Sequence, residues 1–140
     1  MYTLKTSADF DSAHFLRGYE GKCSNIHGHR WSVEIEVGSD RLNQEGQTRG
    51  MIVDFSELKH ALASIVEELD HCLIIERGSL RGKTYEALKE DGFRIIELDM
   101  RPTAENLAKY MYDRMSEQEY MVVKATVYET PNNCASYSEV

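Results

Sequence analysis

The sequence lacks any hydrophobic run that approaches the roughly 18–20 residues of a membrane helix. Its first residues enter an alternating pattern at once, without the apolar segment of a signal peptide. Positive charge is also scarce, because 16 Lys and Arg residues face 24 Asp and Glu residues and leave a net charge of −8. Duplex nucleic-acid binders usually carry a basic patch. We therefore expect a cytoplasmic protein whose partner is neither a membrane nor a nucleic acid, although one local basic pocket would suffice for a small anionic substrate.

Cysteine is equally sparse, with three residues at positions 23, 72 and 134. An odd number without paired spacing does not describe a disulfide framework, so we expect thiol or thiolate chemistry in a reducing compartment. Cys72 and Cys134 have no companion motif, and both are expected to be packing residues. Cys23 lies four residues before His27. It could be a fourth metal ligand, a general base or an inert loop residue.

What is present suits one ordinary soluble domain. Apolar residues make up 41% of the 140 residues and charged residues 29%, a mixture that argues against disorder or a fibrous protein. No internal repeat, low-complexity tract or linker divides the chain. Residues 1–140 are therefore expected to form a single domain.

Hydrophobic periodicity predicts both strands and helices. Alternation with period two, clearest where His27, Trp31 and Val33 share one face, indicates half-buried strands. Helical spacing follows the capping residues Asp54 and Thr103. The expected strands span residues 2–14, 27–37, 51–53, 93–98 and 121–129, the expected helices lie at about 55–69 and after Thr103, residues 84–90 could form a short helix, and 131–140 is expected to be a loop. This order predicts the α+β class, with an antiparallel sheet and two principal helices.

Three histidines lie at predicted strand ends, on faces that are otherwise apolar. His27 and His29 are one residue apart, so on a strand their imidazoles point to the same face and could share a metal ion. His14 ends a separate strand, in phase with the apolar Phe10. Three neutral imidazoles are a ligand set of catalytic zinc, with a fourth position left for water or substrate. The spacing also permits a core histidine at position 14 and a surface His-x-His pair, because His-x-His is a loose pattern. His60 is expected to be solvated.

Carboxylates near predicted element ends supply further candidates. Asp70 could orient the ring of His71 and hold its proton, or the two could be a polar helix terminus. Glu129 is in phase with the apolar Ala125 and Val127, and a carboxylate buried there needs a cationic or multi-donor partner. An amidine-like ligand edge would meet that need through two parallel hydrogen bonds, whereas exposure at the strand end would remove it.

Six segments of the chain, taken in order, resemble the 6-pyruvoyl-tetrahydropterin synthase and 6-carboxytetrahydropterin synthase family. They are Phe10-Asp11-Ser12-Ala13-His14, Cys23-Ser24-Asn25-Ile26-His27-Gly28-His29, Val53-Asp54-Phe55, Leu69-Asp70-His71, Pro102-Thr103-Ala104-Glu105-Asn106-Leu107-Ala108 and Tyr128-Glu129-Thr130. Each alone is weak, but six in the family's order are highly specific and run almost from end to end. The resemblance implies a T-fold (tunnelling fold), a four-stranded antiparallel sheet with two helices on one face. It also implies subunits that join into β-barrels, usually as hexamers of two trimers, with active sites between subunits.

The resemblance also implies a role for each candidate residue. The implied zinc ligands are His14, His27 and His29. Cys23 would be the base, and Asp70 with His71 would form an acid–base relay that could reach Cys23 from a neighbouring chain. Glu129 would anchor the amino-pyrimidine edge of a pterin, helped by Thr103 and Glu105.

The implied substrate is 7,8-dihydroneopterin triphosphate. The compact Cys-x3-His-Gly-His spacing resembles the 6-carboxy branch, which releases acetaldehyde and triphosphate and feeds the synthesis of queuosine and related 7-deazapurines. The alternatives are the 6-pyruvoyl enzyme, which keeps the three-carbon side chain, and a non-catalytic zinc- or pterin-binding protein. The 72–101 segment is longer than in compact members of the family, a departure that concerns the outer wall of the site and not the zinc ligands.

Overall fold

A computed structural model describes residues 1–139 and contains a six-stranded mixed sheet. Its strands are β1 (Tyr2–His14), β2 (His27–Ser39), β3 (Leu73–Glu76), β4 (Ile95–Leu98), β5 (Val122–Thr130) and β6 (Asn133–Tyr137). They lie in the order β4-β3-β1-β2-β5-β6, with the β1–β3 and β3–β4 pairs parallel and the others antiparallel. The helices are α1 (Phe55–Leu69), α2 (Gly82–Glu90) and α3 (Ala104–Ser116), and a 3-10 turn, η1, spans Lys22–Ser24. The predicted α+β class is confirmed.

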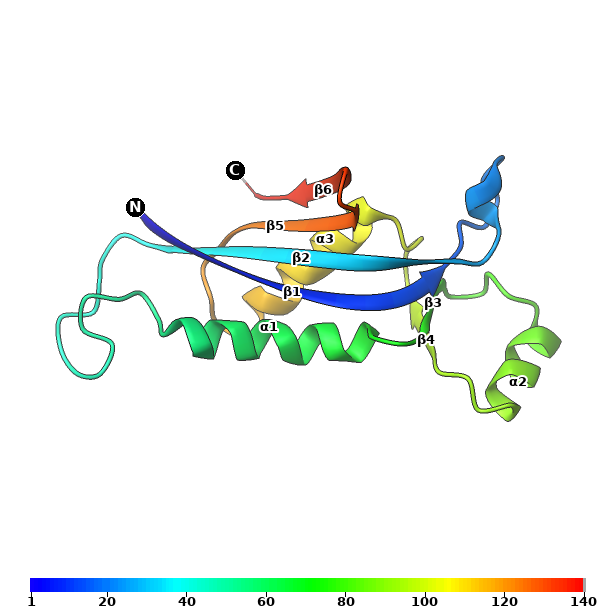
Figure 1. Ribbon diagram of the computed structural model, residues 1–140, viewed down its shortest axis with the longest axis horizontal. Helices are drawn as coiled ribbons and strands as arrows, with labels where there is room; N and C mark the ends of the chain where they lie inside the picture. Colours follow the sequence, from blue (N-terminus) through cyan, green and yellow to red (C-terminus); the bar gives the residue numbers. More distant parts are fainter. Residues whose placement is uncertain (140) are drawn as a thin grey trace.

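The long antiparallel pair β1–β2 forms the centre of the sheet (Figure 1). Its register places Phe10 opposite Trp31, and their stacked rings lie 5.9 Å apart in the core. Burial alternates along β2, as predicted for a half-buried strand, because one face packs against helices while the other is polar. The same register brings His14 opposite His27 at the end of the pair.

Helices α1 and α3 lie on one face of the sheet (Figure 1) and share its main core. Helix α1 begins after Asp54, whose carboxylate accepts a hydrogen bond from the Ser56 amide at 2.8 Å. Helix α3 begins after Thr103, whose hydroxyl accepts one from the Asn106 amide at 3.1 Å. Both predicted N-caps are confirmed, since each satisfies a backbone donor that the first helical turn leaves free.

Three details of the predicted sheet were wrong. Residues 51–53 do not form a strand, because a turn hydrogen bond from the Met51 amide to the Thr48 carbonyl (2.9 Å) holds them in the loop before α1. The tail predicted as a loop contains β6, a polar edge strand that pairs with β5. The prediction lacks β3, a short strand whose partners are distant in sequence. The sheet therefore has six strands and is mixed, instead of four antiparallel strands, and α2 makes a third helix.

The segment between β3 and β4 carries α2 away from the other two helices (Figure 1). A second apolar cluster lies there, in which Phe15, Ile75 and Ile95 are buried and Leu80 and Leu88 pack against them. The long 72–101 segment therefore packs around a small second core, which it shares with Phe15. Across residues 1–139, no helix is both long enough and apolar enough to span a bilayer.

Candidate metal centre and acid–base pair

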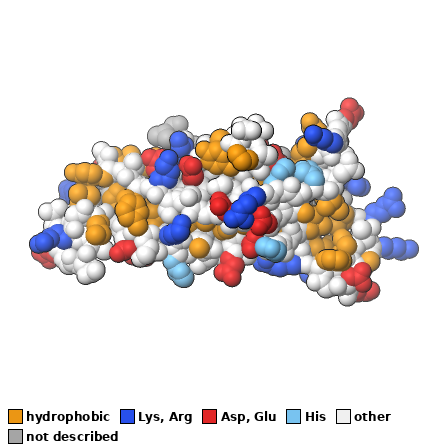
Figure 2. All heavy atoms as spheres, in the orientation of Figure 1, with side chains coloured by type: hydrophobic (Ala, Val, Ile, Leu, Met, Phe, Trp, Pro, Cys, Tyr) orange, Lys and Arg blue, Asp and Glu red, His pale blue; other side chains and the backbone are white. Residues whose placement is uncertain are grey.

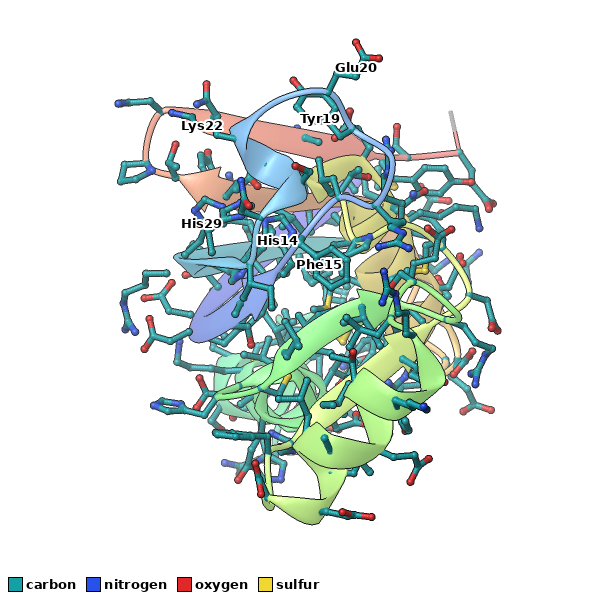
Figure 3. The ribbon with its side chains drawn as sticks, turned by 90° about the vertical axis from the view of Figure 1, so that its right-hand side faces the viewer. His14, Phe15, Tyr19, Glu20, Lys22 and His29 are labelled. Carbon is teal, nitrogen blue, oxygen red and sulfur yellow. The ribbon has the colours of Figure 1, made fainter. Side chains whose placement is uncertain are left out.

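The three predicted zinc ligands meet at one end of the β1–β2 pair. Antiparallel register places His14, the last residue of β1, opposite His27, the first residue of β2. His29 lies two residues further along β2, and the three ring centroids are 4.6 to 5.1 Å apart. Figure 3 shows His14 and His29 beneath the loop that carries Tyr19 and Lys22.

Hydrogen bonds at the far side of two rings fix which nitrogen faces the centre. Nδ1 of His14 lies 2.8 Å from the Pro102 carbonyl oxygen, and Nδ1 of His27 lies 2.7 Å from the Asn25 carbonyl oxygen. A carbonyl oxygen only accepts, so each Nδ1 carries a proton and each Nε2 of the neutral ring keeps a lone pair. Within residues 1–139, the buried Nε2 atoms of His14, His27 and His29 have no hydrogen-bond partner. Such unsatisfied atoms are rare, and a carbonyl behind the ring is a common support of metal-binding histidines.

Burial favours the metal-binding form of two of these rings, those of His14 and His29. The side chain of His14 is 1% exposed, and burial is the main reason why its pKa lies below the ordinary 6.5, with the charge of His27 acting in the same direction. Burial also lowers the pKa of His29, although Glu129 opposes the shift. Neutral imidazoles are the ligating form, and three of them match the ligand set of catalytic zinc. The residues present therefore fit the zinc ion that the resemblance implies.

Glu129, near the end of β5, lies against two of these histidines. Its Oε1 atom is 3.1 Å from Nε2 of His14 and 3.1 Å from Nε2 of His29. Neither Nε2 atom has a hydrogen-bond partner among residues 1–139. The side chain is 31% exposed, so Glu129 is neither a free strand end nor a fully buried charge. One ligand atom from each of His14, His27, His29 and Glu129 lies within 4.8 Å of all the others.

Asp70 and His71 form a pair at the turn after α1. Nδ1 of His71 lies 2.9 Å from Asp70 Oδ2, and Asp70 Oδ1 accepts a hydrogen bond from the Asp11 amide at 2.9 Å. His71 adopts the left-handed backbone conformation, with φ at 55°, which is uncommon outside glycine. This conformation accompanies the contact between the His71 ring and the adjacent Asp70. The Asp11 amide is the main cause that lowers the pKa of Asp70, and the His71 contact adds to it. The ionised carboxylate holds a proton on Nδ1 and leaves Nε2 of His71 to exchange protons.

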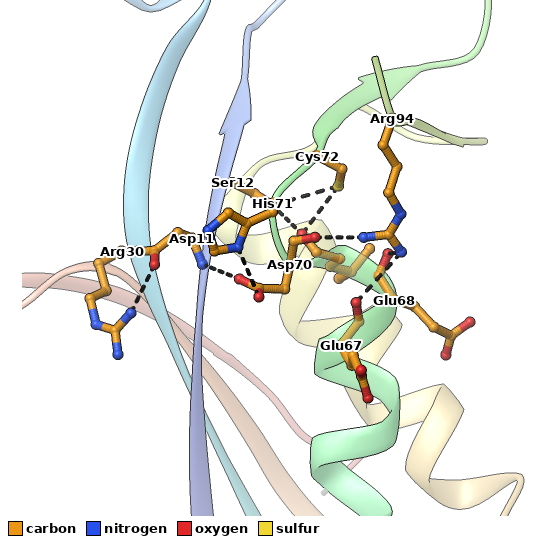
Figure 4. A network of polar contacts seen from close by, with 10 residues as sticks. Asp11, Ser12, Arg30, Glu67, Glu68, Asp70, His71, Cys72 and Arg94 are labelled. Carbon is orange, nitrogen blue, oxygen red and sulfur yellow. Dashed lines mark hydrogen bonds and ion pairs between the residues drawn. The ribbon is translucent and has the colours of Figure 1, made fainter. Parts of the chain in front are cut away.

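Two residues that sequence reasoning missed hold this pair in place (Figure 4). The guanidinium of Arg94 donates to the Asp70 carbonyl and to a carbonyl of the last turn of α1, at 2.5 Å each. The Asp11 carbonyl accepts the His71 amide at 2.6 Å, and its carboxylate pairs with Arg30 at 3.0 Å. Asp11 lies in a segment that carries the family resemblance. Nothing in the sequence pattern marks Arg94, because its partners are backbone carbonyls distant along the chain.

Two cavities open beside the histidines and share Gly28, His29 and Arg30. One, of about 720 Å³, is lined by both His29 and His71. Its apolar wall comes from the segment around α2 and includes Leu73, Leu88, Phe93 and Ile95. The other, of about 630 Å³, is lined by His29 and Glu129 with mostly polar neighbours. Figure 2 shows hydrophobic side chains gathered at the end of the molecule that carries α2, next to histidine side chains.

The remaining predicted site residues lie outside the group of metal-ligand atoms. Cys23 is half-buried in η1, and its sulfur does not belong to that group in residues 1–139, so the interpretation as a fourth ligand gains no support. Thr103 caps α3 and follows Pro102, whose carbonyl supports His14. Glu105 is exposed in the first turn of α3.

The other two cysteines differ from each other. Cys72 is buried, and its thiol donates to the Leu69 carbonyl at 3.1 Å, as expected of a packing residue. Cys134 is exposed on β6, so the packing prediction was wrong there, because β6 is an edge strand. His60 is exposed on α1, as expected.

Known proteins resemble this chain over nearly its whole length. The family model described as 6-pyruvoyl tetrahydropterin synthase matches residues 3–140. The 6-carboxy-5,6,7,8-tetrahydropterin synthase of Aquifex aeolicus is 35% identical over 84% of this chain and 76% of that protein. The Haemophilus influenzae protein of the same name is 29% identical over 99% of this chain and 100% of that protein. These relatives agree with the predicted lyase-type enzyme.

Solved structures share the fold. The 6-pyruvoyl tetrahydropterin synthase of Caenorhabditis elegans has a TM-score of 0.68 and 24% identity, and the match covers 99% of this chain and 96% of that one. An uncharacterized protein of Wolinella succinogenes has a TM-score of 0.75 and 20% identity, covering 99% of this chain and 98% of that one. The predicted T-fold is thereby confirmed, with six strands in the sheet of this chain. The chain belongs to the 6-pyruvoyl tetrahydropterin synthase family.

Proposed function

We propose that this protein is a zinc-dependent 6-carboxytetrahydropterin synthase. It would convert 7,8-dihydroneopterin triphosphate and one water into 6-carboxy-5,6,7,8-tetrahydropterin, acetaldehyde and triphosphate. The observation that carries the proposal is the cluster of three imidazoles whose buried Nε2 atoms have no hydrogen-bond partner in residues 1–139. The choice of reaction is supported by the curated relatives, which are named for it.

His14, His27 and His29 would hold the zinc ion. Bound there, zinc would supply a Lewis acid that polarises side-chain oxygens of the substrate and acidifies the neighbouring carbon–hydrogen bonds. The contribution of the protein is to lower the pKa of His14 and of His29 through burial, which favours the neutral form of these two rings. It also fixes two rings through the carbonyls of Pro102 and Asn25.

Cys23 is the proposed base, and Asp70 with His71 is the proposed relay. Cys23 would remove a proton from a side-chain carbon of the substrate and His71 would return a proton. The electron pair of the broken carbon–hydrogen bond would move into the ring, so this tautomerisation reduces the pterin ring and oxidises the side-chain carbon without an external reductant. Because Asp70 holds Nδ1 of His71, Nε2 is the atom that would transfer the proton. The His71 side chain is 77% exposed beside a large cavity, which suits a residue that serves a site shared between subunits.

Glu129 is the proposed anchor of the pterin, helped by Thr103 and Glu105. A carboxylate can accept two parallel hydrogen bonds from the amino-pyrimidine edge. The cavity of about 630 Å³ beside Glu129 falls in the size range of small-molecule sites.

We also propose a cytoplasmic homohexamer, built from two trimers, that serves queuosine and related 7-deazapurine synthesis. The two edge strands of the sheet, β4 and β6, support assembly through barrels, because an edge strand offers unpaired backbone groups to a neighbouring chain.

The alternative is the 6-pyruvoyl enzyme, after which the matching family model is named. The two are separated by incubating zinc-loaded protein with 7,8-dihydroneopterin triphosphate and measuring acetaldehyde and the pterin product. We expect acetaldehyde in proportion to triphosphate. Turnover without acetaldehyde would exclude the 6-carboxy reaction, and zinc binding without any turnover would indicate a non-catalytic binding protein. Cys23→Ala is the matching control, since turnover that survived this change would show that the base is another group.

A further inference from the structure

We propose that Glu129 is a fourth ligand of the metal while no pterin is bound, and that it leaves the metal to bind the pterin edge. The inference rests on the proposed zinc function of the histidines. It gives Glu129 a second role, that of metal ligand, in addition to its proposed role as pterin anchor.

The position of Glu129 Oε1 suits a metal ligand better than a hydrogen-bond acceptor. It lies 3.1 Å from Nε2 of both His14 and His29, and neither nitrogen has a hydrogen-bond partner in residues 1–139. Ligand atoms about 2.0–2.1 Å from a tetrahedral zinc ion lie roughly 3.3 Å from one another. The observed separations are close to that value, and Nε2 of His27 completes a group of four atoms within 4.8 Å. These separations are the ones expected of four atoms that bind the same ion.

Charge favours the same arrangement. Three neutral imidazoles leave the +2 charge of zinc uncompensated in a site where the side chain of His14 is 1% exposed, and burying such a charge alone is unfavourable. Within residues 1–139, Glu129 is the acidic member of the group that surrounds this centre. The nearby Arg30, which lines the same cavity, pairs with Asp9 and Asp11, so it does not draw Glu129 away.

Glu129 cannot bind the metal and anchor the pterin at the same time. Two parallel hydrogen bonds to a pterin edge require both carboxylate oxygens, whereas Oε1 lies among the histidines in this structure. Glu129 lines the cavity of about 630 Å³ together with His29, and its side chain is partly exposed, so it has room to turn. Arrival of a pterin would therefore draw Glu129 into the cavity and open the fourth metal position only when substrate is present.

The test measures metal binding, not turnover. We would determine the dissociation constant of Zn²⁺ by competition with a chromophoric chelator for the wild-type protein, Glu129→Gln and Glu129→Ala. The matched control is Glu105→Gln, which changes the other proposed pterin carboxylate, an exposed residue outside the metal group. We expect both Glu129 variants to bind Zn²⁺ at least about 10-fold more weakly, the lower end of the loss seen when a supporting metal contact is removed, and the control to match wild type.

The exchange of ligands is followed on the cobalt-substituted protein. Its visible absorption reports the ligand set, so 7,8-dihydroneopterin should shift the wild-type spectrum toward that of substrate-free Glu129→Ala. Equal Zn²⁺ affinities of wild type and Glu129→Ala, or identical cobalt spectra, would overturn this inference and leave the proposed function intact. A wild-type protein that binds no zinc would overturn both.

Discussion

The histidine cluster (His14, His27 and His29) and the relay cluster (Asp11, Asp70 and His71) are built in opposite ways. The first lies on paired strands, where the side chain of His14 is 1% exposed. The second lies around the turn after α1, where the side chain of His71 is 77% exposed. Burial lowers the pKa of His14 and keeps it neutral, whereas the Asp11 amide lowers the pKa of Asp70 and keeps it charged. We therefore expect the first cluster to bind a cation and the second to hold and transfer a proton.

The two clusters also differ in what fixes their geometry. Strand register alone sets His14 opposite His27, and that register is shared by 13 residue pairs. The Asp70–His71 turn depends instead on separate hydrogen bonds from Asp11 and Arg94. We therefore expect the metal site to fail as a unit when one ligand is lost, and the relay to weaken by degrees as its supports are removed.

The largest expected effect is loss of one ligand. His27→Ala should weaken Zn²⁺ binding by at least about 100-fold and abolish turnover, because two imidazoles do not form a catalytic zinc set. The measurement is metal content and chelator competition on purified protein. His60→Ala is the control, since His60 is exposed on α1 and should bind zinc like wild type. Near-normal zinc binding by His27→Ala would contradict the expectation that the three histidines form one metal site that fails when a single ligand is lost.

Mixed oligomers test where the relay acts. Cys23→Ala and His71→Ala should each be nearly inactive, because one lacks the base and the other the acid. If the relay serves a neighbouring subunit, mixing the two variants in equal amounts and reassembling them should restore about a quarter of the wild-type activity. About half of the sites receive an intact Cys23, and about half of those also receive an intact His71 from the neighbouring subunit. Activity is measured before and after reassembly. A mixture that stays inactive would indicate that both residues act within one chain, across the cavity that His29 and His71 both line.

Period-two alternation predicted the face on which each histidine lies, whereas the meeting of all three was implied by the family resemblance. His27 and His29 share a face by parity, and His14 shares the parity of Phe10, which is buried. The helix at 55–69 and both N-caps were predictable from helical spacing and capping residues, because these signals are also local in sequence.

The supports of the relay were not predictable from spacing. The contacts of Arg94 with the end of α1 span 24 residues or more and involve backbone carbonyls, which leave no mark on residue type. Strand β3 escaped prediction because it is short and its partner strands are distant in sequence, and β6 because it is short and mostly exposed at the edge of the sheet. The contact between Asp70 and His71 accompanies the left-handed backbone of His71, which no residue pattern encodes.

Removing Arg94, which holds the Asp70–His71 turn, should lower the rate of proton transfer without changing metal binding. Arg94→Met leaves the Asp70 carbonyl and the end of α1 without their donor, so we expect kcat to fall roughly 3- to 10-fold, which corresponds to about 0.7–1.4 kcal/mol, with Zn²⁺ affinity unchanged. Faster exchange of the His71 amide proton would show that the turn has loosened. The control is Arg114→Met, which removes a donor to the Glu68 side chain of the same helix but no contact with Asp70. Equal losses of kcat in both variants would indicate general weakening of α1 instead.

The smallest expected effect concerns the charge of Asp70. The folded protein lowers the pKa of this carboxyl, so the ionised form contributes stability above the unfolded pKa of about 3.9, and that contribution is lost as the pH falls through the folded value. The melting temperatures of wild type and Asp70→Asn, compared at equal metal loading, should therefore differ by a constant amount between pH 7 and 5 and converge below about pH 4. The difference should not exceed about 3 °C, because solvent screens a side chain that is 38% exposed. A difference that persisted at pH 3 would mean that Asp70 acts through its shape and not its charge, and the contrast between a neutral metal cluster and a charged relay would then no longer hold.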